Sequence, residues 1–166
     1  MCYDRDCSKK DRKKGVLECM IKTYVIDTNV LIQAPYALEC FEDNHLVLPL
    51  VVLEELDGLK KAEGEKGANA RAAVRKLEEY RHKGDLLQGV ELPGGGCLRV
   101  EKNYVNVELP PDLPDDKPDN RILKVCKGLA DDKKADQVIL VTKDIVLRLK
   151  AQILGIKAED FETEQI

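Results

Sequence analysis

Apolar residues in this chain gather into short runs, several of which stop at an acidic residue or a proline. Such runs are typical of buried β-strands and occur at residues 22–27, 45–48, 138–141 and 156–158. Between them, the pattern predicts a short helix at residues 29–38 that Pro35 interrupts, and helices at about residues 50–61, 68–81, 120–129 and 144–155. Because strands alternate with helices, we expect an α/β fold, a three-layer α/β/α sandwich with a mainly parallel sheet.

Glycines mark two of the connections between these elements. The sequence Pro93-Gly94-Gly95-Gly96 predicts the turn of a hairpin formed by residues 86–101. Gly64 and Gly67, with charges between them, predict a joint before the helix at 68–81. Lys66 lies in this joint and is expected on a mobile loop at the rim of the crevice between the strand ends.

Two further segments lead from the hairpin toward the last strands. Apolar residues alternate between residues 105 and 109, which predicts an extended segment. A proline-rich loop at 110–118 follows and brings Asp119 to a position that suits the cap of the next helix.

Composition is that of an ordinary globular protein and restricts the kinds of partner. The chain has 166 residues, of which 43% are hydrophobic and 35% charged, which suits one domain. Its net charge is −4, so binding of a polyanion would need local basic patches. Aromatic residues make up 4% and Trp is absent, so stacking on bases is not expected as the main binding mode.

The two ends of the chain differ in character from the middle. We expect a charged, flexible extension at 1–20, a folded domain at 21–161, and the start of a linker or tail at 162–166. No apolar run approaches the ~20 residues of a membrane span, and the first residues lack the apolar core of a secretory signal. The six cysteines include no Cys-x-x-Cys pair, so a cytoplasmic protein with reduced thiols is expected.

The strongest functional signal is a set of four acids, each where a predicted strand ends or a helix begins: Asp27, Glu55, Asp119 and Asp144. The carboxyl ends of parallel strands open into one shared crevice, so we expect these side chains to lie together. Carboxylates in one place repel one another unless they are protonated or share a cation. Because hard oxygen ligands suit Mg²⁺ or Mn²⁺ better than Zn²⁺, the sequence indicates a metal-dependent enzyme that acts on phosphate esters.

Helical phase distinguishes Glu55 from its acidic neighbours. On the helix predicted from residue 50, Glu55 falls inside the apolar stripe that includes Val52 and Leu56. Glu54 and Asp57 fall on the opposite, solvated side. A glutamate on a core-facing stripe is costly unless it is paired or bound to a metal.

Each acid also has a purely structural interpretation. Asp27, Asp119 and Asp144 could each cap the helix that follows, and Glu55 could pair with a lysine. We favour a shared metal site, because one function explains why all four acids are expected to face the same crevice.

Four motifs together resemble the PIN-domain ribonucleases: Ile26-Asp27-Thr28-Asn29-Val30-Leu31, Leu48-Pro49-x-Val51-Val52-x-x-Glu55-Leu56, Asp119-Asn120-x-Ile122 and Val141-Thr142-x-Asp144. Each motif is weak alone, but the set in this order and spacing is specific, and it covers about residues 21–161.

Three further segments look like the PIN domain at the N-terminus of PhoH-like proteins: Asn69-Ala70-Arg71-Ala72-Ala73, Gly94-Gly95-x-x-Leu98-Arg99-Val100 and Lys143-Asp144-x-x-x-Arg148-x-Lys150-Ala151-x-x-Leu154-Gly155. In that subgroup a P-loop ATPase domain follows the PIN domain. This chain contains no G-x-x-x-x-G-K-[ST], so we interpret it as the PIN portion of a longer protein or as a stand-alone relative.

The resemblance implies a metal-dependent endoribonuclease in which the four acids hold one or two Mg²⁺ or Mn²⁺ ions. Such an ion supplies a water of lowered pKa and neutralises charge during phosphodiester hydrolysis. Asp27 and Asp144 are the implied direct ligands. Glu55 and Asp119 would complete the cage or orient the attacking water.

Other polar residues receive supporting roles. Asn29 and Thr142 are expected to orient the carboxylates, or equally to act as helix caps. Single-stranded RNA is the expected substrate, and a C-terminal PhoH-type ATPase domain and a second copy of the chain are possible partners. Six basic residues could contact RNA phosphates around the crevice, although a solvated face is the default interpretation of such charges: Lys60, Lys61, Arg71, Arg75, Lys143 and Arg148.

Three alternative functions also cluster acids in this way or share the PIN fold. A haloacid-dehalogenase-type phosphatase needs Asp-x-Asp after its first strand, whereas this chain has Asp27-Thr28-Asn29. A phosphate-accepting receiver domain needs adjacent acids after the first strand and an Asp at the third, and neither is present. The third alternative stays open: an RNA-binding or assembly PIN module with little cleavage of its own, regulated by an absent ATPase domain.

Overall fold

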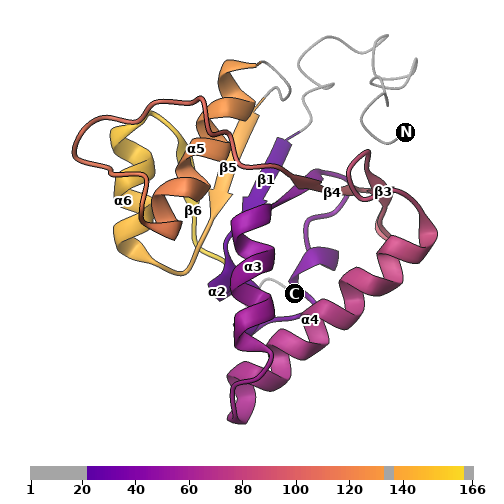
Figure 1. Ribbon diagram of the computed structural model, residues 1–166. Coiled ribbons are helices and arrows are strands. Elements are labelled where there is room, and N and C mark those ends of the chain that lie inside the picture. The colour runs from indigo at the N-terminus through magenta and orange to yellow at the C-terminus, as the bar shows by residue number, and fades with distance from the viewer. Residues whose placement is uncertain (1–21, 133–136, 163–166) are drawn as a thin grey trace, which may run out of the picture.

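A computed structural model describes residues 22–132 and 137–162, and a six-stranded sheet organises this part of the chain (Figure 1). The strands are β1 (Lys22–Ile26), β2 (His45–Pro49), β3 (Val90–Glu91), β4 (Cys97–Glu101), β5 (Gln137–Val141) and β6 (Lys157–Glu159). Their order across the sheet is β3-β4-β2-β1-β5-β6. Every neighbouring pair is parallel except the hairpin of β3 and β4, as predicted.

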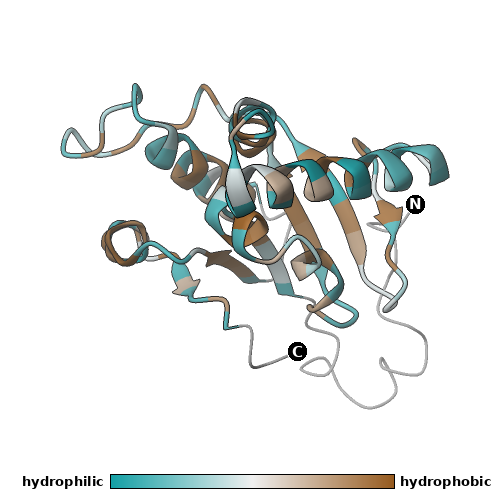
Figure 2. Cartoon of the chain, turned by 90° about the horizontal axis from the view of Figure 1, so that it is seen from below, coloured by the Kyte–Doolittle hydropathy of each residue, from teal (hydrophilic) through white to brown (hydrophobic). Residues whose placement is uncertain are grey.

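Helices and sheet form a three-layer α/β/α sandwich, which confirms the predicted fold class. The helices are α2 (Thr28–Gln33), the 3₁₀ helix η3 (Ala37–Glu39), α3 (Leu50–Leu59), α4 (Gly64–Lys83), α5 (Pro118–Asp131) and α6 (Ile145–Ile153). Strands β1, β2 and β5 are apolar runs buried along nearly their whole length, as expected of parallel strands covered on both faces. In Figure 2 these central strands are largely brown, whereas α4 is mostly teal.

Helix α4 begins at Gly64, four residues before the start at residue 68 that the sequence predicts. Lys66 lies in its first turn, so the prediction of a mobile loop there is wrong. Gly67, Ala70 and Ala73 are all buried and extend the apolar face of the helix back past the predicted joint. A Cβ at Gly67 would collide with the carbonyl oxygen of Ala62, so this glycine permits a close backbone approach at the α3–α4 corner.

The connection into α5 also differs from the prediction. Val105 lies in a turn and is 73% exposed, so the expected extended segment is wrong. Helix α5 begins at Pro118, a residue that suits the first helical position, and its cap residue is Lys117. Asp119 therefore lies inside the first turn and does not cap the helix, which corrects the capping interpretation.

Several remaining expectations can be compared with the described residues only in part. The predicted extension at 1–20 and the residues from 163 onward lie outside the described part of the chain. Cys97 is disulfide-bonded, so the expectation of reduced thiols is wrong for this residue, whereas Cys40 and Cys126 are free. Within the described ranges, no helix has the length and apolar content that crossing a membrane would require.

Gly67→Ala tests the close approach at the α3–α4 corner. The added methyl would meet backbone that cannot move cheaply, so the free energy of unfolding should fall by about 1–3 kcal/mol. Gly58→Ala is the matched control, because a Cβ at this α3 position meets nothing within 4 Å. This control should leave stability unchanged or raise it by up to ~1 kcal/mol. Urea denaturation measures the free energy of unfolding of both variants. An equal change in the two would contradict the close approach described at Gly67.

Candidate active site

All four acids predicted from the sequence line one cavity of about 420 Å³. Asp27 follows β1 and Asp144 follows β5, both at the carboxyl ends of neighbouring parallel strands. Glu55 comes from α3, the helix that follows β2, and Asp119 comes from the first turn of α5. The carboxyl edge of the sheet thus gathers side chains that are as many as 117 positions apart in the sequence.

The pairing of β1 with β5 fixes the orientation of Asp27. The backbone N–H of Asp27 donates to the carbonyl oxygen of Val141 at 3.0 Å, which places Asp27 beside Thr142. The Thr142 hydroxyl donates to Asp27 Oδ2 at 2.7 Å, and the backbone N–H of Thr28 donates to Oδ1 at 2.7 Å. Because both carboxylate oxygens accept a hydrogen bond and Asp27 is only 5% exposed, this side chain has a fixed direction.

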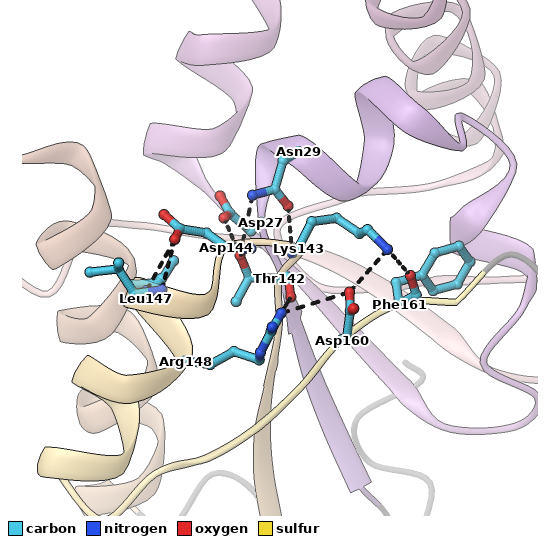
Figure 3. A network of polar contacts seen from close by, with 10 residues as sticks. Asp27, Asn29, Thr142, Lys143, Asp144, Leu147, Arg148, Asp160 and Phe161 are labelled. Carbon is cyan, nitrogen blue, oxygen red and sulfur yellow. Dashed lines mark hydrogen bonds and ion pairs between the residues drawn. The ribbon is translucent and has the colours of Figure 1, made fainter.

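Thr142 connects the two loops that carry the acids (Figure 3). Its Oγ1 accepts from the backbone N–H of Asp144 at 3.1 Å and from Asn29 Nδ2 at 3.2 Å. Asn29 Oδ1 in turn accepts from the backbone N–H of Lys143 at 3.0 Å. Asn29 and Thr142 therefore join the start of α2 to the loop between β5 and α6.

Asp144 and Glu55 each make polar contacts of their own. Asp144 Oδ1 accepts from the backbone N–H groups of Val146 at 2.9 Å and Leu147 at 3.4 Å, so Asp144 caps α6. Glu55 Oε1 accepts from the hydroxyl of Thr28 at 3.1 Å. Within the described residues Glu55 makes no ion pair, so pairing with a lysine does not explain its position.

Burial and like charges act on two of the carboxyl groups. Burial is the main cause that raises the pKa of Asp27, and the charges of Asp119 and Asp144 add to it. Burial also raises the pKa of Glu55, with further contributions from the charges of Asp27 and Asp119. Hydrogen bonds to each carboxylate partly offset these effects. The fold therefore holds these acids together at an electrostatic cost that a bound cation would relieve.

The donor set fits a hard divalent cation, although the side chains do not form a complete cage. No three His, Cys, Asp or Glu residues in the described part of the chain are grouped so that they could hold a metal by themselves. Mg²⁺ usually takes one or two carboxylates and completes its shell with water and substrate phosphate. The four carboxylates around this open cavity can supply the one or two that Mg²⁺ needs, even though they do not all point at one position.

Two of the basic residues predicted to contact RNA pair with Asp160, a partner that the sequence did not indicate (Figure 3). Their contact with RNA stays a prediction. Lys143 Nζ donates to the carbonyl oxygen of Phe161 at 2.6 Å and pairs with Asp160 Oδ1 at 3.1 Å. Arg148 Nη1 donates to the carbonyl oxygen of Thr142 at 2.7 Å and lies 3.7 Å from Asp160 Oδ1. These contacts hold the β5–α6 loop from outside the cavity.

The other four basic candidates lie at the end of α3, in the turn that follows it or on α4, and they do not line the acidic cavity. Lys60 pairs with Asp57 at 2.6 Å, and Arg71 Nη1 donates to the carbonyl oxygens of Lys60 at 2.7 Å and Ala62 at 3.3 Å. Lys61 and Arg75 are exposed. Contact of these residues with RNA stays a prediction.

Residues 24–162 match the PIN domain family. The protein PhoH2 of Bacillus subtilis (strain 168) is 42% identical over 152 residues, which cover 89% of this chain and 34% of that protein. The protein PhoH2 of Mycolicibacterium smegmatis is 39% identical over 152 residues, covering 90% of this chain and 34% of that protein. The chain therefore spans about a third of the length of the curated relatives it matches.

Two solved structures share the fold at low sequence identity. The T. brucei RRP44 PIN domain has a TM-score of 0.53 and 14% identity, covering 96% of this chain and 87% of that one. A domain of a functionally unknown protein from Methanocaldococcus jannaschii has a TM-score of 0.52 and 22% identity, covering 86% and 92%. At these identities the likeness shows the fold alone.

Glu55→Gln should stabilise the metal-free protein at neutral pH, since it removes a carboxylate that burial and nearby charges disfavour. The folded state raises the pKa of Glu55, so the folded protein binds this proton more tightly than the unfolded chain does. Wild-type stability contributed by this group is lost as pH rises from the unfolded pKa near ~4.3 through the raised folded pKa. The advantage of the variant should therefore grow between about pH 4 and pH 7.

Urea denaturation in EDTA across this pH range measures the effect. The Gln Oε1 can still accept from Thr28, so the comparison isolates the charge. Glu54→Gln, an exposed neighbour on the same helix, is the matched control and should show no such growing advantage. A wild type more stable than Glu55→Gln at pH 7 in EDTA would contradict the electrostatic cost described.

Asp160→Ala should loosen the β5–α6 loop, because Lys143 and Arg148 lose their shared partner. These groups are partly exposed, so the local loss is about 0.5–1 kcal/mol, equivalent to roughly two- to fivefold faster hydrogen exchange at the amides of Lys143 and Asp144. Lys157→Ala, which breaks the exposed pair with Glu159 on β6, serves as control. Identical exchange in both variants would rule out the proposed role of Asp160.

Proposed function

This chain belongs to the PIN domain family, whose members are generally nucleases, and from this premise we propose that it is a metal-dependent endoribonuclease acting on single-stranded RNA. The observation that carries the proposal is the single cavity lined by Asp27, Glu55, Asp119 and Asp144. Four separate structural roles do not account for it, because Asp119 does not cap α5 and Glu55 pairs with no lysine among the described residues.

Asp27 and Asp144 are the residues that would hold Mg²⁺ or Mn²⁺ directly. Both follow neighbouring strands, and both have their carboxylates oriented by hydrogen bonds from nearby groups. Glu55 and Asp119 would complete the coordination through water. When bound, the ion supplies a water of lowered pKa and neutralises charge on the phosphate.

The residues of the chain have distinct tasks in this proposal. Thr142 keeps Asp27 in one orientation, so little reorganisation is needed during the reaction. Glu55 would orient the attacking water, because the hydroxyl of Thr28 holds its Oε1 in one direction. Asn29 fixes the β5–α6 loop through its bonds to Thr142 and to the backbone of Lys143.

A second candidate function is an RNA-binding or assembly module with little cleavage of its own. The observation in its favour is that no three acidic, histidine or cysteine side chains of the described residues are grouped to hold a metal. The relatives are about three times as long as the matched region, so in this alternative a further domain, of the PhoH ATPase type, would regulate the cavity.

Cleavage of labelled single-stranded RNA in Mn²⁺, Mg²⁺ and EDTA tests the two functions. The wild type should cut only with metal, and Asp27→Asn/Asp144→Asn should lower the rate at least roughly a hundredfold. Glu54→Gln/Asp57→Asn neutralises two exposed acids on α3 and is the matched control, which should cut like the wild type. RNA binding without metal-dependent cutting by the wild type would favour the binding module.

A further inference from the structure

A second cavity adjoins the acidic one. It has a volume of about 600 Å³ and is lined by Asn29, Ile32, Gln33, Glu65, Lys66 and Asn69. Asn29, Ile32 and Lys66 also line the acidic cavity, so the two hollows meet along α2 and the first turns of α4. Both volumes lie within the roughly 300–1,000 Å³ of typical ligand pockets.

Lys66 is the only cation among the described residues that line either cavity. Its ammonium group makes no ion pair or hydrogen bond within the described part of the chain. It therefore offers three donors to an incoming anion at the boundary between the two cavities. Glu65 lines the second cavity only and disfavours an anion beside it, which favours the position of Lys66 for a phosphate.

The backbone that carries Lys66 is held in place. Gly67 packs so closely against the carbonyl of Ala62 that no side chain fits between them. Arg71 bonds to the carbonyl oxygens of Lys60 and Ala62 and ties α4 to the end of α3. Asn69 Nδ2 donates to the carbonyl oxygen of Ile32 at 2.7 Å and ties α4 to α2. A binding group on such a corner needs little ordering when a ligand arrives.

The rest of the second cavity offers hydrogen-bonding groups and one apolar side chain. Both ends of the Asn29 side-chain amide are already hydrogen-bonded, because Nδ2 donates to Thr142 Oγ1 and Oδ1 accepts from the backbone N–H of Lys143. Within the described residues, Asn69 Oδ1 and the side-chain amide of Gln33 make no hydrogen bond, and Ile32 is half-buried. None of the described residues that line the cavity is aromatic. These groups suit a nucleoside recognised at the edge of its base and not one held by stacking.

We propose that the second cavity binds the nucleotide next to the scissile phosphate of the RNA. The phosphate of this nucleotide lies at Lys66, and its base faces Gln33 and Asn69 across Ile32. Lys66 is then a substrate-positioning residue, and Gln33 contributes to base preference. This inference rests on the proposed function, because the second cavity adjoins the one in which the scissile phosphate would bind.

Lys66→Ala tests the phosphate contact through a separation of binding from chemistry. In single-turnover cleavage of single-stranded RNA with Mn²⁺, the concentration for half-maximal rate should rise roughly two- to tenfold while the maximal rate is retained. The slope of log affinity against log salt concentration should become shallower by about 0.7, the value for one phosphate contact on a single strand. Lys66→Arg should restore both, and Lys83→Ala, at the far end of α4, should change neither.

Gln33→Ala tests the base contact with four RNA homopolymers. Its relative affinities for them should differ from those of the wild type by roughly two- to tenfold, as expected for one lost hydrogen bond. If the wild type cuts RNA and both Lys66→Ala and Gln33→Ala behave like it, the second cavity is not a nucleotide site and the nuclease proposal stands. If the wild type binds RNA without cutting it, the nuclease proposal fails, and the salt slope of Lys66→Ala still decides the inference. A wild type that does not bind RNA overturns both.

Discussion

β1 and β5 pair in a register that sets Ile26 opposite Val141, and the next residues, Asp27 and Thr142, therefore lie beside each other. The Thr142 hydroxyl uses this proximity to orient Asp27, and it also receives bonds from Asn29 and from the backbone of Asp144. A slip of one residue would turn every side chain of the strand to the other face and separate these groups. The geometry of the acidic cavity thus depends on strand pairing in the core.

The electrostatics of the cavity follow from where the cations lie. Lys143 and Arg148 are close in sequence to Asp144, yet both contact Asp160 on the outer side of the loop. Neither neutralises the acids, whose charges and burial raise the pKa of Asp27 and Glu55. A site that stays negative attracts a divalent cation and repels RNA phosphate, so in the proposed function the metal must join the substrate to the protein. A basic group such as Lys66 can therefore bind phosphate only at the edge of the acidic cavity, where the RNA strand no longer contacts the metal.

Local patterns predicted the strands and the positions of the acids, because buried parallel strands form short apolar runs and the residues after them must reach the carboxyl edge of the sheet. The local patterns gave wrong predictions where the same residue type can serve two structural roles. Gly67 looked like a joint, but it permits a close contact inside a helix. Asp119 looked like a cap, but Pro118 already occupies the first helical position and shifts the cap to Lys117. Asp160 had no local signal, since its partners are reached only through the tertiary fold.

Asp144 can cap a helix and bind a metal at the same time. Both capping bonds go to Oδ1, and within the described residues Oδ2 accepts none. Asp27 accepts one hydrogen bond on each oxygen, which leaves lone pairs on both. In each case the structural bond holds the carboxylate in one direction, so the entropy of ordering it is spent during folding and not when a ligand binds. A capping carboxylate at the carboxyl edge of a parallel sheet is therefore already oriented for binding. Its role as a cap does not argue against a role in metal binding.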